Sequence, residues 1–206
     1  MNFETGSYSQ LKTPSLSTRL GQSPNAQNEP IALYLDALAG AELVAGQSVL
    51  LSGVVYTMRD AGHRRCLDYL EEHGDLPFGL KGQSLFYAGP TELRPDYAVQ
   101  GIPPFAAVGP TTASRMDFAA PALYRAGIAA TIGKGHRSAE VCAVCREFGC
   151  AYFAAVGGAA ALLATKVISA ELVAWPDLGP EALYKLEIVD FPALIAIDGK
   201  GRDIYG

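Results

Sequence analysis

The residues best suited to chemistry in this chain are one hydroxyl and three cationic side chains. Thr111 and Arg115 lie in the stretch Val108–Asp117, whose Gly-Pro corner separates an apolar run from a helix-like segment. Arg59 directly precedes a helical pattern, and Lys134 stands between two glycines. Guanidinium groups and helix N-termini both favour anions, carboxylates in particular. The pattern predicts an anion site, although each stretch alone is also consistent with an ordinary turn or a surface charge.

Short strands are expected directly before three of these places. β-Branched and aromatic residues predict a strand before Arg59, and the amphipathic pattern from Asp60 to the stop at Gly74 predicts the helix that follows it. Apolar runs likewise predict a strand before Thr111 and another before Lys134. The three expected strands are Ser48–Thr57, Phe105–Val108 and Ile128–Ile132.

The rest of the chain alternates between the two periodicities. Helices are expected at Ile31–Ala39, at Phe118–Arg125 with Asp117 as N-cap and Gly127 as stop, from Ser138 through Phe148, and at Ala159–Lys166. Further strands are expected at Ser84–Tyr87, Cys150–Val156, Glu171–Trp175, Tyr184–Val189 and Phe191–Asp198. The predicted fold class is α/β, with a mixed or mostly parallel central sheet flanked by helices. Gly89-Pro90-Thr91 and Gly109-Pro110-Thr111 are expected to be neighbours at one sheet edge.

Composition limits the classes of function. Of 206 residues, 50% are hydrophobic and 18% are charged, which predicts a globular chain, and the net charge of −5 leaves no basic stripe for nucleic acid. The longest uncharged apolar run, Ala151–Ala164, is too short to span a membrane, and no secretory signal precedes it, so we expect a cytoplasmic protein. Residues 1–45 predict a polar arm with a short helix, in which Leu11–Pro14 could form an edge strand, and residues 46–206 predict the catalytic domain.

Three closely spaced cysteines raise the question of a metal site. Cys142 and Cys145 fall on the helix expected after Ser138, and Cys150 follows that helix, with no fourth cysteine or histidine nearby to complete a tetrahedral set. Buried free cysteine commonly serves as a small packing residue. We therefore expect no metal ligand in this chain, with cluster ligation as the alternative interpretation.

Several separate stretches together are similar to one family. They are Ser52-Gly53, Tyr56-Thr57-x-Arg59-Asp60-x-x-His63, Tyr87-x-Gly89-Pro90, Gly109-Pro110-Thr111-Thr112-x-x-Arg115-Met116-Asp117, Gly133-Lys134-Gly135, Val156-Gly157-Gly158-x-Ala160-Ala161-Leu162 and Asp190-Phe191-Pro192-Ala193. From about residue 45 onward, the chain resembles the β subunit, equivalent to the C-terminal domain, of the iron–sulfur hydro-lyases, namely class I fumarases and L-tartrate dehydratases. Gly62 departs from the alanine that this family more often has.

The resemblance implies a swivelling β/β/α domain that supplies half of an active site. It implies an α subunit whose own cysteines ligate a [4Fe-4S] cluster, in an assembly of the α2β2 type. Arg59, Arg115 and Lys134 would hold the two carboxylates of a C4 dicarboxylate, and Thr111 would place its hydroxyl beside the reacting carbon. A threonine hydroxyl is a weak base, so the α subunit could supply the group that moves the proton.

The sequence leaves open the roles of two further residues and the choice of substrate. Asp60 and His63, three apart on one predicted helix, could orient Arg59 or only cap the helix. Similarity to fumarases at Ala155–Ala160 and at Asp190–Pro192 favours reversible hydration of fumarate to malate, with L-tartrate dehydration as the alternative. A dicarboxylate-binding module and a purely structural subunit are the other interpretations.

Overall fold

A mixed sheet organises the computed structural model, which describes residues 29–95 and 102–206. Within those residues the strands are β1 (Ile31–Tyr34), β2 (Ser48–Thr57), β3 (Ser84–Phe86), β4 (Ala130–Gly133), β5 (Ala151–Ala154), β6 (Val167–Ala174) and β7 (Leu183–Ile197). Their order is β1-β2-β3-β4-β5-β7-β6, and β1 to β5 are parallel neighbours. β7 runs antiparallel to β5, to β6 and also to β2. The strands β2, β3, β4, β5 and β7 therefore close into a ring, and the predicted mixed α/β fold is confirmed.

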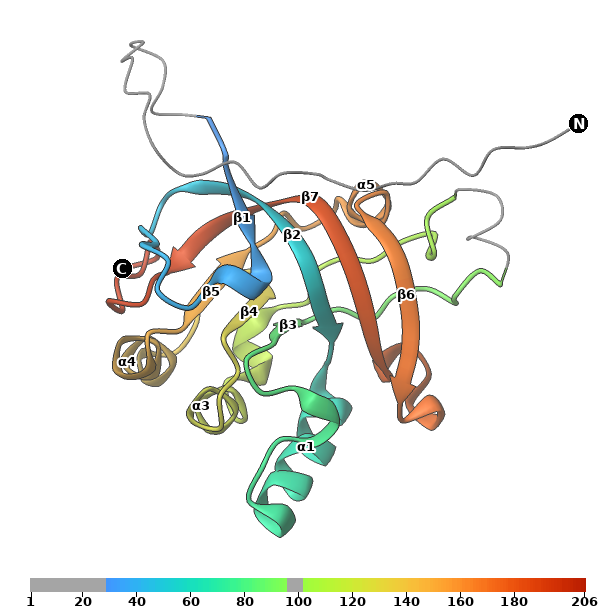
Figure 1. The fold of residues 1–206 in the computed structure, drawn as a ribbon, viewed down its shortest axis with the longest axis horizontal. Helices are drawn as coiled ribbons and strands as arrows, with labels where there is room; N and C mark the ends of the chain where they lie inside the picture. Colours follow the sequence, from blue (N-terminus) through green and yellow to red (C-terminus); the bar gives the residue numbers. More distant parts are fainter. Residues whose placement is uncertain (1–28, 96–101) are drawn as a thin grey trace, which may run out of the picture.

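Helices cover the ring from two sides (Figure 1). The α-helices are α1 (Asp60–His73), α3 (Ala120–Arg125), α4 (Ala139–Phe148) and α5 (Ala160–Ala164), and the 3-10 turns are η1 (Leu35–Ala37), η2 (Pro77–Gly79), η3 (Ala113–Met116) and η4 (Pro176–Glu181). In Figure 1, α1, α3 and α4 lie below the strands, and α5 lies on the opposite side. None of these helices is long and apolar enough to cross a membrane.

Successive residues of the strands belong alternately to two separate hydrophobic cores. Leu85 and Tyr152 belong to a cluster that packs against α1, α3 and α4, and their neighbours Phe86 and Phe153 belong to a second cluster with Phe191 from β7. Because successive side chains of a strand point to opposite faces, the second cluster fills the inside of the ring. The strand ends that carry the candidate site are thus anchored on both faces.

The strongest local signals are confirmed. β2 has the predicted bounds, α1 starts at Asp60 and ends before Gly74, and α4 starts after Ser138. The Ser138 hydroxyl accepts a hydrogen bond from the backbone N–H of Val141 at 3.4 Å, as an N-cap does. The bounds of β3, β4, β5 and α5 differ from the predicted ones by at most two residues, which is the usual uncertainty of element ends.

The helix expected at Ile31–Ala39 is wrong. Residues 31–34 form β1, with Ile31 opposite Val49 and Tyr34 opposite Ser52, and only the single 3-10 turn of η1 follows. A short apolar run does not distinguish strand from helix, and here the open edge of β2 supplies the pairing partner. The strand expected at Leu11–Pro14 lies outside the described residues.

The strand expected at Phe105–Val108 is also wrong, although Phe105 and Val108 are buried as that pattern indicates. The backbone N–H groups of Ala106 and Ala107 donate to the hydroxyl of Thr91, at 3.0 and 3.2 Å. The N–H of Val108 donates to the carbonyl of Ala160 at 3.0 Å. The segment therefore satisfies its backbone through a side chain and a helix, so it needs no strand partner.

Asp117 is not the N-cap of the next helix. α3 begins at Ala120 with Ala119 in the cap position, and no side chain caps it. The carboxylate of Asp117 instead accepts hydrogen bonds from Arg137 and from the backbone of Ser138, both at 2.6 Å. The buried Arg137 therefore binds the carboxylate that the sequence assigned to the helix N-cap.

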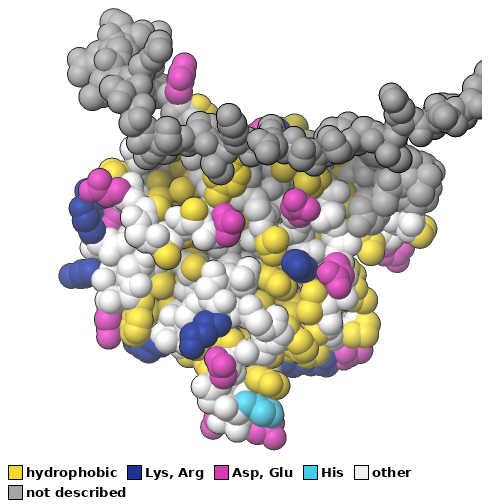
Figure 2. Space-filling view, viewed as in Figure 1, with side chains coloured by type: hydrophobic (Ala, Val, Ile, Leu, Met, Phe, Trp, Pro, Cys, Tyr) yellow, Lys and Arg dark blue, Asp and Glu magenta, His cyan; other side chains and the backbone are white. Residues whose placement is uncertain are grey.

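The two C-terminal strands predicted between Tyr184 and Asp198 form one strand, β7, bent at Asp190, whose φ is 49°. The strand predicted at Glu171–Trp175 is the second half of β6, which pairs with β7 only among the described strands and stands at one end of the strand order. Ile168 and Leu172 of β6 are about half exposed. Figure 2 shows hydrophobic side chains interspersed with charged ones on this side of the molecule.

Candidate functional site

One edge of the ring gathers the predicted site residues. Because β2 to β5 run parallel, their carboxyl ends lie together, and the loops after them meet at that edge. Arg59 follows β2, Gly89 follows β3, Lys134 follows β4 and Gly157 follows β5. The loop that carries Thr111 crosses the same edge, where isolated bridges pair Ala88 with Pro110 and Thr112 with Lys134. The two Gly-Pro-Thr turns are therefore neighbours, as predicted.

Backbone hydrogen bonds fix Thr111 between β3 and β4. Its N–H donates to the carbonyl of Tyr87 at 2.7 Å, and its carbonyl accepts from the N–H of Lys134 at 3.1 Å. The N–H of Ala113 then donates to the carbonyl of Lys134 at 2.8 Å. A Cβ on Gly133 would lie 2.9 Å from the Cβ of Ala113, so only glycine allows this approach. Thr111 and Lys134 are thus set side by side.

Arg115 joins this loop to the first turn of α1. One terminal nitrogen, Nη2, lies 2.7 Å from Oδ2 of Asp60, and Nη1 lies 3.5 Å from the hydroxyl of Thr111. The side chain of Arg115 is 48% exposed and that of Asp60 is 26% exposed. Asp60 therefore orients Arg115, while the sequence offered Arg59 as its partner.

Arg59 is held from the other side by Glu181. Its Nη2 lies 3.5 Å from Oε1 of Glu181, whose Oε2 accepts a hydrogen bond from the N–H of Ala61 at 2.8 Å. The guanidinium packs against Gly89, where a Cβ would lie 2.7 Å from Nη1. Nε of Arg59 is buried without a hydrogen-bond partner among the described residues. Gly89 thus makes room for a cation that still has an unused donor.

His63 supports the backbone of Arg59. Its Nδ1 lies 2.8 Å from the carbonyl of Arg59, and because a carbonyl can only accept, Nδ1 carries the proton. The ring is fully buried and contacts Tyr87 edge to face, with centroids 5.1 Å apart. Burial lowers the pKa of His63 from 6.5 to about 4. His63 is therefore neutral at pH 7 and adds no positive charge to the site.

Lys134 reaches from β4 toward the loop after β5. A Cβ on Gly157 would lie 3.2 Å from Cδ and 3.7 Å from Nζ of Lys134. Within residues 29–95 and 102–206, Nζ of Lys134 makes no hydrogen bond or ion pair. Its ammonium is therefore available to an anion that enters this edge.

Together these contacts form a continuous row from Lys134 through Thr111, Arg115 and Asp60 to Arg59. Arg59 pairs with Glu181, Arg115 pairs with Asp60, and Lys134 pairs with neither, so these five side chains carry a net positive charge before any ligand binds. Such a row can bind a dianion and stabilise negative charge that develops on it. The structure brings the residues together; their roles toward a substrate remain predictions.

The cysteines do not fit an iron–sulfur cluster. Cys145 and Cys150 are buried, and burial raises the pKa of their thiols to about 12 and about 11, which keeps them protonated at neutral pH. Sγ of Cys142 lies 3.6 Å from Asp203 instead. No group of three or more His, Cys, Asp or Glu side chains in the described part of the chain could hold a metal ion.

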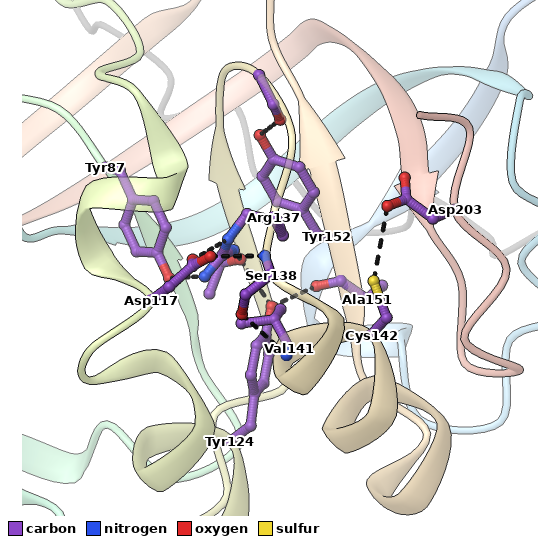
Figure 3. Close-up of polar contacts among 12 residues, drawn as sticks. Tyr87, Asp117, Tyr124, Arg137, Ser138, Val141, Cys142, Ala151, Tyr152 and Asp203 are labelled. Atoms are coloured by element: carbon purple, nitrogen blue, oxygen red, sulfur yellow. Dashed lines mark hydrogen bonds and ion pairs between the residues drawn. The ribbon is translucent and has the colours of Figure 1, made fainter. Parts of the chain in front are cut away.

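Two residues that support the site escaped the sequence reasoning. Glu181 lies 120 positions from Ala61, whose N–H it binds, and no local pattern marks it. Arg137 lies next to the N-cap Ser138 and is fully buried against Asp117 (Figure 3). An arginine two residues after Gly135 of the Gly-Lys-Gly turn is the one local signal that could have identified it.

Comparison with known proteins gives the family. The family model described as Fumarase C-terminus matches residues 8–206. "Fumarate hydratase 2" of Leishmania major is 36% identical over 162 residues, and "Fumarate hydratase class I, anaerobic" of Escherichia coli K12 is 37% identical over 157. These alignments cover 78% and 75% of this chain but only 28% of each relative.

A relative of similar length matches over most of its sequence. "Putative L(+)-tartrate dehydratase subunit beta" of Methanocaldococcus jannaschii is 36% identical over 168 residues, which cover 80% of this chain and 84% of that protein. The family match spans almost the whole chain, and it includes the six site residues that the sequence predicted: Arg59, Asp60, His63, Thr111, Arg115 and Lys134. The chain belongs to the Fumarase C-terminus family.

Proposed function

We propose that this chain is the β subunit of a [4Fe-4S]-dependent hydro-lyase that reversibly hydrates fumarate to malate. The observation that carries the proposal is the row of Arg59, Arg115 and Lys134 at one sheet edge, beside the hydroxyl of Thr111. Three converging cations suit a substrate with two carboxylates. Relatives named as fumarate hydratases support the reaction class.

In this proposal the cations distinguish the transition state from the substrate. Removal of a proton next to a carboxylate gives a carbanion-like species whose charge spreads into that carboxylate. Arg115 and Lys134, which flank Thr111, would bind the carboxylate that gains charge, and Arg59 would hold the other. Fixed donors stabilise the more charged species more strongly than the substrate, and this difference accelerates the reaction.

Thr111 would contact the reacting carbon rather than act alone as the base. Its backbone is fixed by Tyr87 and Lys134, and its hydroxyl can accept a hydrogen bond from Arg115. That donor orients the hydroxyl but does not make it strongly basic. The group that takes up the proton would then come from the partner chain.

The proposed partner is an α subunit that carries the cluster, in an α2β2-type cytoplasmic assembly. The protonated, separately engaged thiols of Cys142, Cys145 and Cys150 support the placement of the cluster outside this chain. The relative named "Putative L(+)-tartrate dehydratase subunit beta" supports a two-chain arrangement. The alignment with this chain covers 84% of that relative. In the proposed organisation, residues 46–206 form the catalytic domain and residues 1–45 form an arm.

The test is activity of the complex. The chain would be combined with its α subunit under anaerobic conditions, and turnover of fumarate, malate and L-tartrate would be compared. We expect hydration of fumarate, and a loss of about 100-fold or more in kcat/KM for Arg115→Ala. Arg125→Ala, which removes an exposed arginine paired with Glu140, is the matched control and should keep wild-type turnover.

The other outcomes distinguish the alternatives. L-Tartrate dehydratase is the second candidate, favoured by the relative of similar length, and turnover of tartrate without malate would establish it. Calorimetric binding of a dicarboxylate without turnover would indicate a binding module. Full activity in Arg115→Ala would indicate a purely structural subunit.

A further inference from the structure

Arg137 is a cation enclosed by the protein. Its side chain is fully buried, and Nε lies 2.6 Å from Oδ1 of Asp117. Nη1 donates to the hydroxyl of Thr131 at 3.0 Å, and Nη2 donates to the hydroxyl of Tyr87 at 3.4 Å. The guanidinium also lies over the rings of Tyr87 and Tyr152, at 5.3 and 4.9 Å from their centroids. Each nitrogen thus has a protein partner, and the group has one permitted position.

The ion pair joins the two loops that carry the candidate site (Figure 3). Asp117 ends the turn that contains Arg115, two residues earlier, and Arg137 follows Lys134 by three residues. The second carboxylate oxygen of Asp117 accepts from the N–H of Ser138 at 2.6 Å, so one side chain connects η3 to the start of α4. At their other ends the same loops are tied by the backbone bonds of Thr111, Ala113 and Lys134.

Tyr87 completes the arrangement from β3. Its hydroxyl accepts from Arg137, and its carbonyl accepts from the N–H of Thr111 at 2.7 Å. One residue therefore contacts both the ion pair and the loop with the reactive hydroxyl. A shift of Arg137 would act on Thr111 through Tyr87 and on Arg115 through Asp117.

We propose that Arg137 is a positioning residue for the dicarboxylate site: its pair with Asp117 sets the separation of Arg115 and Lys134. This inference rests on the proposed function. A buried ion pair is seldom retained for stability, because apolar residues of similar volume often stabilise a core as well. Its place between two site loops gives it a geometric role, and displacement of a binding group by about 1 Å can lower a rate by about 100-fold.

The kinetic test uses the complex with the α subunit. Arg137→Met retains an unbranched aliphatic stem but removes the charged guanidinium and its three hydrogen bonds. We expect kcat/KM to fall about 100-fold, with kcat falling more than KM rises. The reason is that displaced cations stabilise the transition state less, while they still bind the substrate. Arg137→Lys keeps the charge but lacks the planar group that reaches Asp117, Thr131 and Tyr87 together, so it should recover only part of the loss.

The matched control is Arg202→Met. Arg202 pairs with the buried Asp198 at 2.6 Å, close to the paired ends of β5 and β7 that lie opposite the site edge. This variant also leaves a buried carboxylate without its arginine, although Asp198 keeps three backbone N–H donors. It therefore measures the effect of losing an arginine–carboxylate pair away from the site. It should leave kcat and KM within about twofold of wild type.

Hydrogen exchange in the same complexes gives a second measurement that does not depend on turnover. In Arg137→Met we expect faster exchange at the amides of Thr111, Ala113 and Lys134, with little change along β2. In Arg202→Met these three amides should exchange as in wild type.

The outcomes separate the inference from the proposed function. If Arg115→Ala abolishes turnover while Arg137→Met matches Arg202→Met in both measurements, Arg137 is only structural and the inference is overturned. If the wild-type complex turns over no C4 dicarboxylate, the proposed function and the role in that site both fail. In that case, faster amide exchange confined to the two loops in Arg137→Met would show only that the Arg137–Asp117 pair orders these loops.

Discussion

At the scale of single residues, the site is notable for arginines that already have carboxylate partners. Asp60 lies against Arg115 and Glu181 lies against Arg59, while all four side chains keep at least a quarter of their surface exposed. A partly exposed ion pair holds an arginine in place at little cost and can share it with an entering anion. The acids thus orient the cations without neutralising the row.

His63 should make the stability of the protein depend on pH. Its pKa of about 4 in the folded state lies below 6.5, so at acid pH the unfolded chain binds a proton that the folded chain does not. The contribution of His63 is complete above pH 6.5 and is lost as pH falls toward 4. The free energy of unfolding, measured in urea at pH 7.5 and pH 5, should therefore fall by ~2 kcal/mol from this residue.

The control for that prediction is His63→Gln, whose side-chain amide can still donate to the carbonyl of Arg59. The variant should have a correspondingly smaller difference in unfolding free energy between the two pH values. An identical pH dependence in both proteins would show that folding does not lower the pKa of His63.

Gly89 should control the position of Arg59. The methyl of Gly89→Ala would lie 2.7 Å from Nη1 and 3.2 Å from Cδ of Arg59, so the flexible guanidinium must move. We expect KM of the complex to rise about tenfold, equivalent to about 1.4 kcal/mol of binding free energy. In the Arg59→Met background the same change should raise KM much less, because the guanidinium is gone and only the carbonyl of Pro180, 3.1 Å from the added methyl, stays close. Additive losses would contradict this explanation.

At the scale of elements, the close approach of β4 to η3 decides where Thr111 lies. A methyl on Gly133 would lie 2.9 Å from Cβ of Ala113 and 3.1 Å from Cδ2 of Tyr87, both in the packed core. Gly133→Ala should lower the free energy of unfolding by about 1–3 kcal/mol and reduce turnover, because it separates η3 from Lys134.

The double variant Gly133→Ala with Ala113→Gly moves the methyl from one element to the other. It should recover most of the stability and turnover if the close approach is the cause. Chemical denaturation of both variants would measure this, and no recovery would mean that Gly133 is required for another reason.

At the scale of the whole molecule, the site is one-sided. All its cations lie on a single sheet edge, and among residues 29–95 and 102–206 no three His, Cys, Asp or Glu side chains lie together so that they could hold a metal ion. We expect the purified chain, incubated anaerobically with iron and sulfide, to bind no [4Fe-4S] cluster and to show no hydratase activity. The complex with the α subunit should have both.

Iron and sulfide analysis with visible absorption would check this expectation. Replacement of Cys142 by serine should leave the cluster content of the complex unchanged, since that thiol contacts Asp203. A cluster bound by this chain alone and lost in Cys142→Ser would contradict the proposal.

The sequence by itself determined the elements with strong local signals. A ten-residue run rich in β-branched and aromatic residues suffices for β2, and amphipathic spacing with an N-cap or a terminal glycine suffices for α1 and α4. The order of motifs also determined the family, since the predicted resemblance and the match to Fumarase C-terminus agree. These properties depend on neighbours along the chain, which the sequence states directly.

Only the tertiary structure decided which partner each polar group takes. Asp117 was expected to cap a helix, but Arg137, 20 residues away, holds its carboxylate, and Asp60 pairs with Arg115 across 55 residues. Phe105–Val108 has the composition of a strand, yet Thr91 and Ala160 satisfy its backbone. Distant donors and acceptors compete for the same group, and the closed ring of strands determines which of them come within hydrogen-bond distance.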